Sequence, residues 1–163
     1  MIDTPLVIYD DDHRKILTLL TRLVRDASAK GIFLVDKNGQ LLAEAGEMRG
    51  IDSTSLASLT AGNIAATGGL AKLLGEDEFP IHFHQGQRDN LHITLVGGRV
   101  ILVVVFDERS SLGLVRLRVK KAGAELAHLF EEIRKKAERA QAAGQGSPFS
   151  EITDEDIDNL FSE

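Results

Sequence analysis

The stretch VILVVVF at residues 100–106 decides the fold, because it is apolar at every position. Such a short valine-rich run predicts a β-strand rather than a helix. Successive side chains of a strand point to opposite faces of the sheet, so a strand that is apolar throughout needs cover on both faces. The stretch therefore predicts a sheet with helices on both faces, in three layers.

Further strands are predicted on the N-terminal side of this one. LHITLV at residues 91–96 pairs with the central strand through Gly97-Gly98, and Pro80 opens another strand, IHFHQ, at residues 81–85. Farther upstream, Asn38-Gly39 separates two apolar runs. This dipeptide predicts a tight turn with positive φ between strands near 32–36 and 41–45.

Three helices complete the domain. Apolar residues recur at helical spacing over residues 10–29, 53–74 and from Ser110 or Ser111 to about Arg139. Gly31 and Gly75 are the expected helix stops, and Asp52 or Ser53 is the expected N-cap of the second helix. The predicted order is helix, two strands, helix, three strands, helix. Residues 1–139 form the domain, and 140–163 form a flexible linker and an acidic tail.

Composition and charge exclude several functions. The chain has 163 residues and no cysteine, so disulfides and thiolate chemistry are excluded. Its 19 basic residues balance 19 acids in the body, and the six acids of the tail supply the net charge of −6. A neutral body gives no electrostatic argument for nucleic-acid binding. The acidic N-terminus is no signal peptide and the apolar runs are too short to cross a bilayer, so we expect a soluble cytoplasmic protein without membrane insertion.

The second helix raises a question, because TAGNIAATGGLAKLLG at residues 60–75 carries glycine in its interior. Three helical glycines cost roughly 3 kcal/mol relative to alanine. On a helical projection the leucines fall on one arc, which we expect to face the core: Leu56, Leu59, Leu70, Leu73 and Leu74. The opposite arc carries six small residues and one lysine and is here called the small-residue ridge: Ser58, Ala61, Gly62, Ala65, Gly68, Gly69 and Lys72.

The ridge has three interpretations, because a smooth and nearly uncharged surface lets another backbone approach closely. It packs under another part of the same chain, against the same helix of a second subunit, or against a different protein. The combination of the last two, a symmetric dimer whose paired helices form a platform, is the favoured interpretation. A phosphate-binding loop is not supported, because no strand leads into a glycine-rich loop and no Gly-Lys-Ser/Thr follows.

Other candidate chemistry is weak. His82 and His84 share one strand face, and His92 on the next strand could join them, but no carboxylate or thiol completes a metal site. No nucleophile-elbow motif marks a hydrolase. We therefore expect no catalytic site, no metal and no cofactor. Arg88, Arg99 and Arg109 lie near turns, where an arginine can reach a partner GTPase.

The acidic tail has two interpretations. It is either a solubilising end or a short recognition helix. The second is favoured because three apolar residues fall on one side as anchors: Ile157, Leu160 and Phe161.

Four segments resemble the roadblock/dynein-light-chain family, in particular its bacterial gliding-motility members. They are FLVDKNGQL (33–41), SLASLTAGNIAATGGLAKLLGE (55–76), FDERSSLGLVRLR (106–118) and SPFSEITDEDIDNLFSE (147–163). The resemblance implies an α+β, three-layer α/β/α roadblock fold with a five-stranded antiparallel sheet. It also implies a homodimer joined through the edge strand that carries Ile81, His82, Phe83 and His84.

The same resemblance implies a partner. One small Ras-like GTPase of the MglA type, in its GTP form, docks on the dimer in a 2:1 complex that controls cell polarity and gliding motility. The dimer activates hydrolysis by stabilising the switch regions, without an arginine finger. Ala65 and Gly69 are the implied contact positions, and the tail contacts the GTPase at a second place. The alternative is a roadblock dimer that tethers proteins and leaves hydrolysis unchanged.

Overall fold

The central sheet has five antiparallel strands in the order β2-β1-β5-β4-β3. The computed structural model describes residues 6–47, 49–144 and 159. The strands are β1 (Gly31–Asp36), β2 (Leu41–Gly46), β3 (Ile81–Gln85), β4 (Asn90–Val96) and β5 (Val100–Phe106). β5 is buried along its whole length and pairs with β1 and β4. The predicted five-stranded antiparallel sheet is confirmed.

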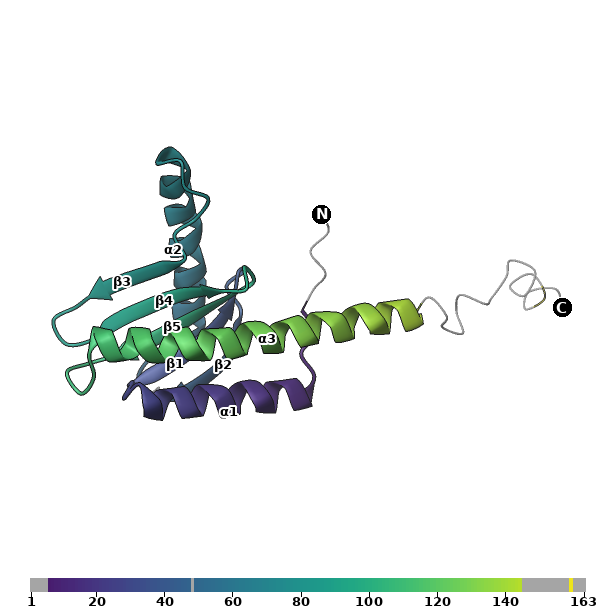
Figure 1. Ribbon diagram of the computed structural model, residues 1–163, viewed down its shortest axis with the longest axis horizontal. Coiled ribbons are helices and arrows are strands. Elements are labelled where there is room, and N and C mark those ends of the chain that lie inside the picture. Colours follow the sequence, from purple (N-terminus) through teal and green to yellow (C-terminus); the bar gives the residue numbers. More distant parts are fainter. Residues whose placement is uncertain (1–5, 48, 145–158, 160–163) are drawn as a thin grey trace.

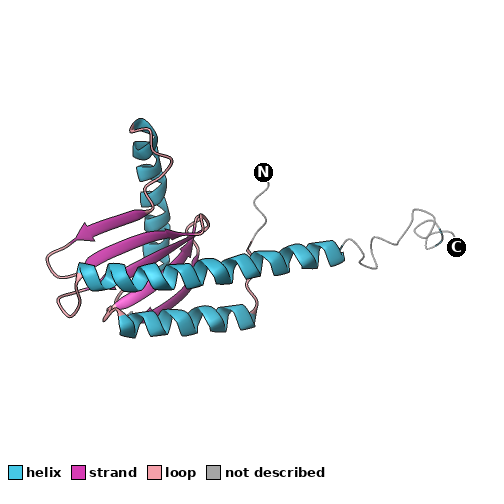
Figure 2. Ribbon diagram, in the orientation of Figure 1, coloured by secondary structure: helices cyan, strands magenta, loops and turns pink. Residues whose placement is uncertain are grey.

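Helices cover both faces of the sheet, as predicted. α1 (Asp10–Asp26) and α3 (Leu112–Gly144) lie on one face, and α2 (Ser53–Leu73) lies on the other (Figures 1 and 2). β5 sends alternate side chains into two separate cores. Leu102 and Val104 join the core under α1 and α3, whereas Ile101 and Val103 join the core under α2. The three-layer fold therefore follows from the apolar strand.

The first helix ends earlier than predicted. α1 stops at Asp26, Ser28 adopts φ of +51°, and Gly31 begins β1 instead of ending the helix. The amide of Ala29 donates to the carbonyl of Val24 at 2.9 Å, and that of Ser28 donates to Arg25 at 3.2 Å. This pair of bonds is a Schellman motif with serine at the left-handed position that glycine usually takes. The missing glycine is why the sequence placed the stop too late.

The third helix is longer than predicted. It continues past Arg139 and ends at Gly144. Its apolar stripe fades there, but other features favour helix. The Arg134 guanidinium bonds the carboxylates of Glu131 and Glu138, each at 2.5 Å, across one turn on either side. Alanine, the strongest helix former, is frequent in the last two turns.

The hairpin at Asn38-Gly39 is present, but its turn differs from the expected primed type. Only Gly39 has positive φ, at +90°, and its amide donates to the carbonyl of Asp36 at 3.1 Å. The Asp36 carboxylate accepts bonds from the amides of Asn38 and Gln40 at 2.9 Å. A side chain thus supplies acceptors for this turn, which is followed by an irregularity in the β1–β2 register.

Replacing Gly46 with alanine should destabilise the fold strongly. Gly46 has φ of +96°, and an added Cβ would lie 2.6 Å from the carbonyl oxygen of Lys30. Left-handed strain and a backbone clash together predict a loss of more than about 2 kcal/mol in the free energy of unfolding, measured with urea. Gly50→Ala is the matched control, because Gly50 has φ of +79° with nothing within 4 Å. Equal losses in the two variants would contradict the clash.

Candidate protein-binding surface

The ends of α2 are fixed as the sequence predicts. The carboxylate of Asp52, the N-cap, accepts bonds from the amide of Ser55 at 3.1 Å and from its hydroxyl at 2.7 Å. These hydrogen bonds lower the pKa of Asp52, and the bond from the Ser55 hydroxyl has the largest effect. Ser53 also donates to Glu44 of β2 at 2.6 Å, which ties the start of α2 to the sheet. At the other end Gly75 has φ of +79°, the conformation expected of a helix stop.

The predicted core face of α2 holds for Leu56, which is half-buried against the core under α2, but it is wrong for the other four leucines. Leu59, Leu70, Leu73 and Leu74 are 57–83% exposed, whereas the buried positions of the helix are Ala57, Thr60 and Ala71. Figure 1 shows why: α2 crosses behind the sheet, and its C-terminal half runs past the β3 edge. Small side chains let its first half lie close to the sheet, and the projecting half leaves its leucines uncovered. The buried stripe is rotated by roughly 110° from the leucines.

The glycines of the small-residue ridge face open space, whereas Ser58 and Ala61 at its start lie beside the turn at Gly39. A Cβ added at Gly62, Gly68 or Gly69 would meet nothing within 4 Å. Beside Ala65 and the last two glycines lies a hollow of about 280 Å³, which the loop at 77–79 borders without filling it. No packing inside the described part of the chain therefore requires these glycines. The interpretation in which the ridge packs under its own chain is wrong for those residues.

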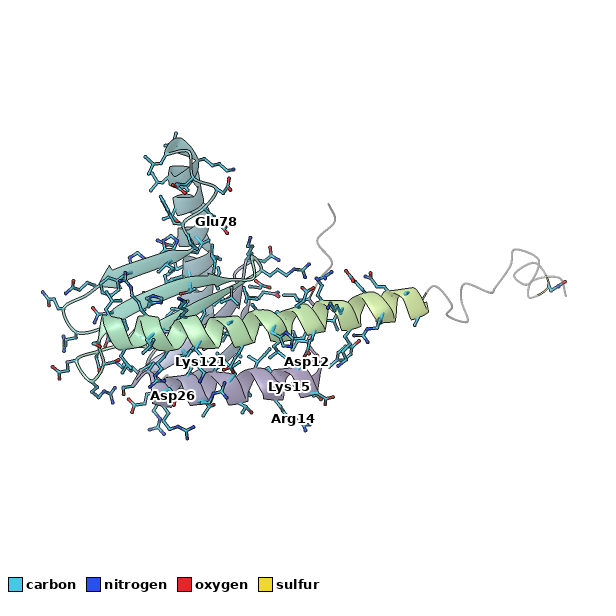
Figure 3. The ribbon with its side chains drawn as sticks, viewed as in Figure 1. Asp12, Arg14, Lys15, Asp26, Glu78 and Lys121 are labelled. Carbon is cyan, nitrogen blue, oxygen red and sulfur yellow. The ribbon has the colours of Figure 1, made fainter. Side chains whose placement is uncertain are left out.

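Charge is also unevenly distributed over the faces. Along α2 the only charged residue is Lys72. Figure 3 shows charged side chains gathered instead on α1 and α3, including Arg14, Lys15 and Lys121, while Glu78 lies in the loop beside α2. The α2 face is thus apolar and nearly uncharged, which is typical of the centre of a protein–protein interface.

The strand β3 forms one edge of the sheet and leaves its outer side unpaired in the described chain. Ile81 is 53% exposed and Phe83 is 36% exposed. They lie on the α3 face, where the Phe83 ring stacks on Phe106 with centroids 6.2 Å apart. The opposite side of β3 carries His82 and His84. The projecting end of α2 runs past this edge of the sheet (Figure 1).

The three histidines do not come together. His92 pairs with Phe83 and therefore points to the α3 face, opposite to His82 and His84. His82 Nε2 lies 2.8 Å from the carbonyl oxygen of Phe79. Within residues 6–47 and 49–144, no group of three or more histidines or carboxylates is placed to hold a metal ion. The suggested cluster is corrected: the register separates its members.

One exposed feature escaped the sequence analysis, namely a groove of about 530 Å³ between α2 and the strands β3 and β4. Leu59, Asn63 and His84 line it, and Asn63 Oδ1 is buried without a hydrogen-bond partner. The sequence does contain an indication of this groove, because the polar residue Asn63 lies on the same helical arc as the leucines. A polar residue there argues against a fully buried face.

One of the arginine candidates, Arg109, is paired with carboxylates of its own chain. Arg109 is held by Asp107, whose carboxylate lies 3.0 Å from Nε and raises the pKa of the guanidinium.

The predicted tail anchors Ile157, Leu160 and Phe161 lie outside the described residues. In the described part of the chain, no helix is long and apolar enough to cross a membrane.

Comparison with known proteins agrees with this architecture. The model of the Roadblock/LC7 domain matches residues 15–106. The chain belongs to the Roadblock/LC7 family. No significant match is found among curated protein sequences.

Several solved structures are similar to this roadblock chain. MglB of Myxococcus xanthus is 61% identical with a TM-score of 0.74, and the match covers 78% of this chain and 96% of that one. The gliding protein MglB of Thermus thermophilus is 37% identical with a TM-score of 0.74, over 80% and 99%. An MglB with a tetrameric arrangement is 36% identical with a TM-score of 0.76, over 81% and 99%.

Alanine at Gly62 or Gly69 should stabilise the roadblock domain. Each change removes the conformational cost of a helical glycine and meets no neighbouring atom. We expect the free energy of unfolding in urea to rise by about 0.5–1 kcal/mol for each variant. Gly39→Ala is the control with the opposite sign, because Gly39 has φ of +90° and its Cβ would lie 3.2 Å from Ser58 Cα. A loss of stability at Gly62 or Gly69 would mean that the ridge is already in contact in the free protein.

Proposed function

We propose that this chain is a cytoplasmic homodimer that binds one small Ras-like GTPase of the MglA type in its GTP form and activates GTP hydrolysis. By analogy with the MglB proteins, it controls cell polarity and gliding motility. The observation that carries the proposal is the open small-residue ridge of α2, placed beside exposed leucines that the single chain cannot bury.

The proposed dimer explains why leucines of α2 are exposed in the single chain. Leu59, Leu70, Leu73 and Leu74 lie on one side of the projecting helix, and the unpaired edge of β3 lies next to it. Pairing β3 with its copy would satisfy the open backbone groups of that edge and join the two sheets. The same two-fold axis would set the two α2 helices side by side and cover their leucines. One solved MglB has a tetrameric arrangement, which supports the proposed association of this chain.

The GTPase accounts for the ridge. Once the leucines are covered, the ridges of the two α2 helices form one surface, from Ser58 through Ala61, Gly62, Ala65, Gly68 and Gly69 to Lys72. A surface with few atoms beyond Cβ lets switch loops approach backbone to backbone. One asymmetric GTPase over the two-fold axis excludes a second, which gives the 2:1 complex.

In this proposal the dimer stimulates hydrolysis because its surface is complementary to the ordered switch regions, and it inserts no arginine into the GTPase. The ridge supplies no arginine, and Lys72 at its end is its only cation. GTPase switches are order–disorder elements, so a surface that binds their ordered form shifts the population toward the hydrolytically competent state. The acidic tail makes the second contact through Ile157, Leu160 and Phe161. The chain itself needs no active site, cofactor or metal for this role.

Aspartate at both Leu59 and Leu70 should convert the dimer to a monomer. Both side chains are more than half exposed in the single chain, so the fold should tolerate the change. Two charges at a buried apolar contact are expected to abolish association. Size-exclusion chromatography with light scattering measures the mass, and circular dichroism checks the fold. Leu117→Asp on α3, which is 64% exposed, is the control and should remain dimeric. A dimeric double variant would exclude this face.

Arginine at Ala65 or Gly69 should abolish GTPase activation while the dimer persists. A long charged side chain buried without a partner is expected to weaken binding by more than about a hundredfold. GTP turnover of the cognate MglA-type GTPase is measured with and without each variant, together with binding. Leu117→Arg adds the same charge on the opposite side of the sheet and should leave turnover unchanged. If the unaltered chain binds the GTPase without changing turnover, the chain is a scaffold and the proposal fails.

A further inference from the structure

A cavity of about 500 Å³ lies on the face opposite α2, between α3 and the strands β3 and β4. Its apolar part comes from Ile81, Val96 and Val119, and its polar part from His92, Arg116 and Lys120. No carboxylate lines it. The cavity is large enough for an aromatic side chain, and His92, Arg116 and Lys120 can each present an N–H group, while Thr94 adds a hydroxyl.

His92 leaves one ring nitrogen without a partner. The residue is 1% exposed, and its Nδ1 lies 3.2 Å from the hydroxyl oxygen of Thr94. Nε2 is buried and has no hydrogen-bond partner. Burial, with the nearby positive charge of Arg116, lowers the pKa of His92 and so favours the neutral imidazole. When the Thr94 hydroxyl donates to Nδ1, Nε2 carries the hydrogen and is a donor in need of an acceptor.

Two cations at the rim are also unmatched. Arg116 and Lys120 are exposed, and neither is in an ion pair with any residue of 6–47 or 49–144. They lie one turn apart on α3, beside the cavity mouth. Two cations and a buried donor around an apolar cavity match an apolar group flanked by carboxylates.

The chain carries such a segment outside the described core. Residues 150–163 hold all six acids beyond Arg139, no base, and one aromatic residue after Ile157, namely Phe161. Asp158 and Glu163 flank this phenylalanine. We propose that this acidic segment docks on its own α3 face, with Phe161 in the cavity and the flanking carboxylates at His92, Arg116 and Lys120.

The chain is long enough for this contact. Lys120 and Gly144 are 24 residues apart on α3, which corresponds to about 36 Å of helix. The 16 residues from 145 to 160 can span up to about 53 Å when extended. Phe161 can therefore return to the cavity within one polypeptide.

Docking at this cavity has a functional consequence. The cavity opens on the α3 face, whereas the ridge lies on the α2 face. A docked segment is held away from the ridge, so a partner that needs the segment must first release it. The docking itself involves no GTPase, and its test is independent of the proposed function.

Hydrogen–deuterium exchange of the full-length protein tests the docking. We expect residues 150–163 to be protected, and the R116E/K120E variant to accelerate their exchange roughly tenfold through loss of charge-assisted bonds. Phe161→Ser should have a similar effect without altering charge. K121E/K135E is the matched control, because it changes the net charge of α3 equally at exposed positions that do not line the cavity. Circular dichroism confirms that each variant folds.

A charge exchange gives the sharpest outcome. Combining R116E/K120E with D158K/E163K should restore the protection of residues 150–163, which a merely unfolded or weakened α3 would not do. Exchange of the segment that is fast in the unaltered protein, or equally slow in R116E/K120E, would overturn the proposal. Protection that disappears on dilution would also overturn it, because the occupant would then be a second copy.

Discussion

The burial of β5 on both faces is the constraint on which the rest of the molecule depends. A strand that sends Leu102 to one side and Val103 to the other must be covered twice. Two helices share one face, and α2 alone serves the other. α2 crosses the sheet and extends past the β3 edge (Figure 1). The exposed end of α2 and the open β3 edge therefore lie at the same end of the sheet.

Much of the fold followed from local sequence. β5, the Asn38-Gly39 hairpin and the Asp52 cap carry signals that do not depend on the rest of the chain. The errors arose where such a signal was missing or misleading. Ser28 ends α1 without glycine, and alanine continues α3 where the apolar stripe fades. The register of β3 against β4 pairs His92 with Phe83 and so separates it from His84, and the exact register of this hairpin is not encoded in the spacing of the histidines.

The leucines of α2 show a deeper limit. Amphipathic analysis assumes that the apolar arc of a helix faces the core of its own chain. In α2 that assumption fails, because alanine and threonine face the sheet while leucines face outward. The three helical glycines of the ridge meet no neighbour within 4 Å, whereas four of the five leucines predicted to face the core are exposed. A helix that turns one side to the sheet and leaves its leucines and its glycines on two further sides cannot be resolved by a two-sided projection.

The two outer faces of the sheet differ in the kind of partner that they suit. The α2 face is apolar and smooth, with Lys72 as the only charge of its helix, so it favours contacts that exclude water and depend on shape. The α3 face is charged and holds a buried imidazole nitrogen with no partner, so it favours acceptors of hydrogen bonds. The hollow beside the ridge is bordered by Asp77 and Glu78, whereas the cavity on the α3 face is lined by Arg116 and Lys120 and by no carboxylate. The fold therefore places the cations Arg116 and Lys120 on the face of the sheet opposite the ridge.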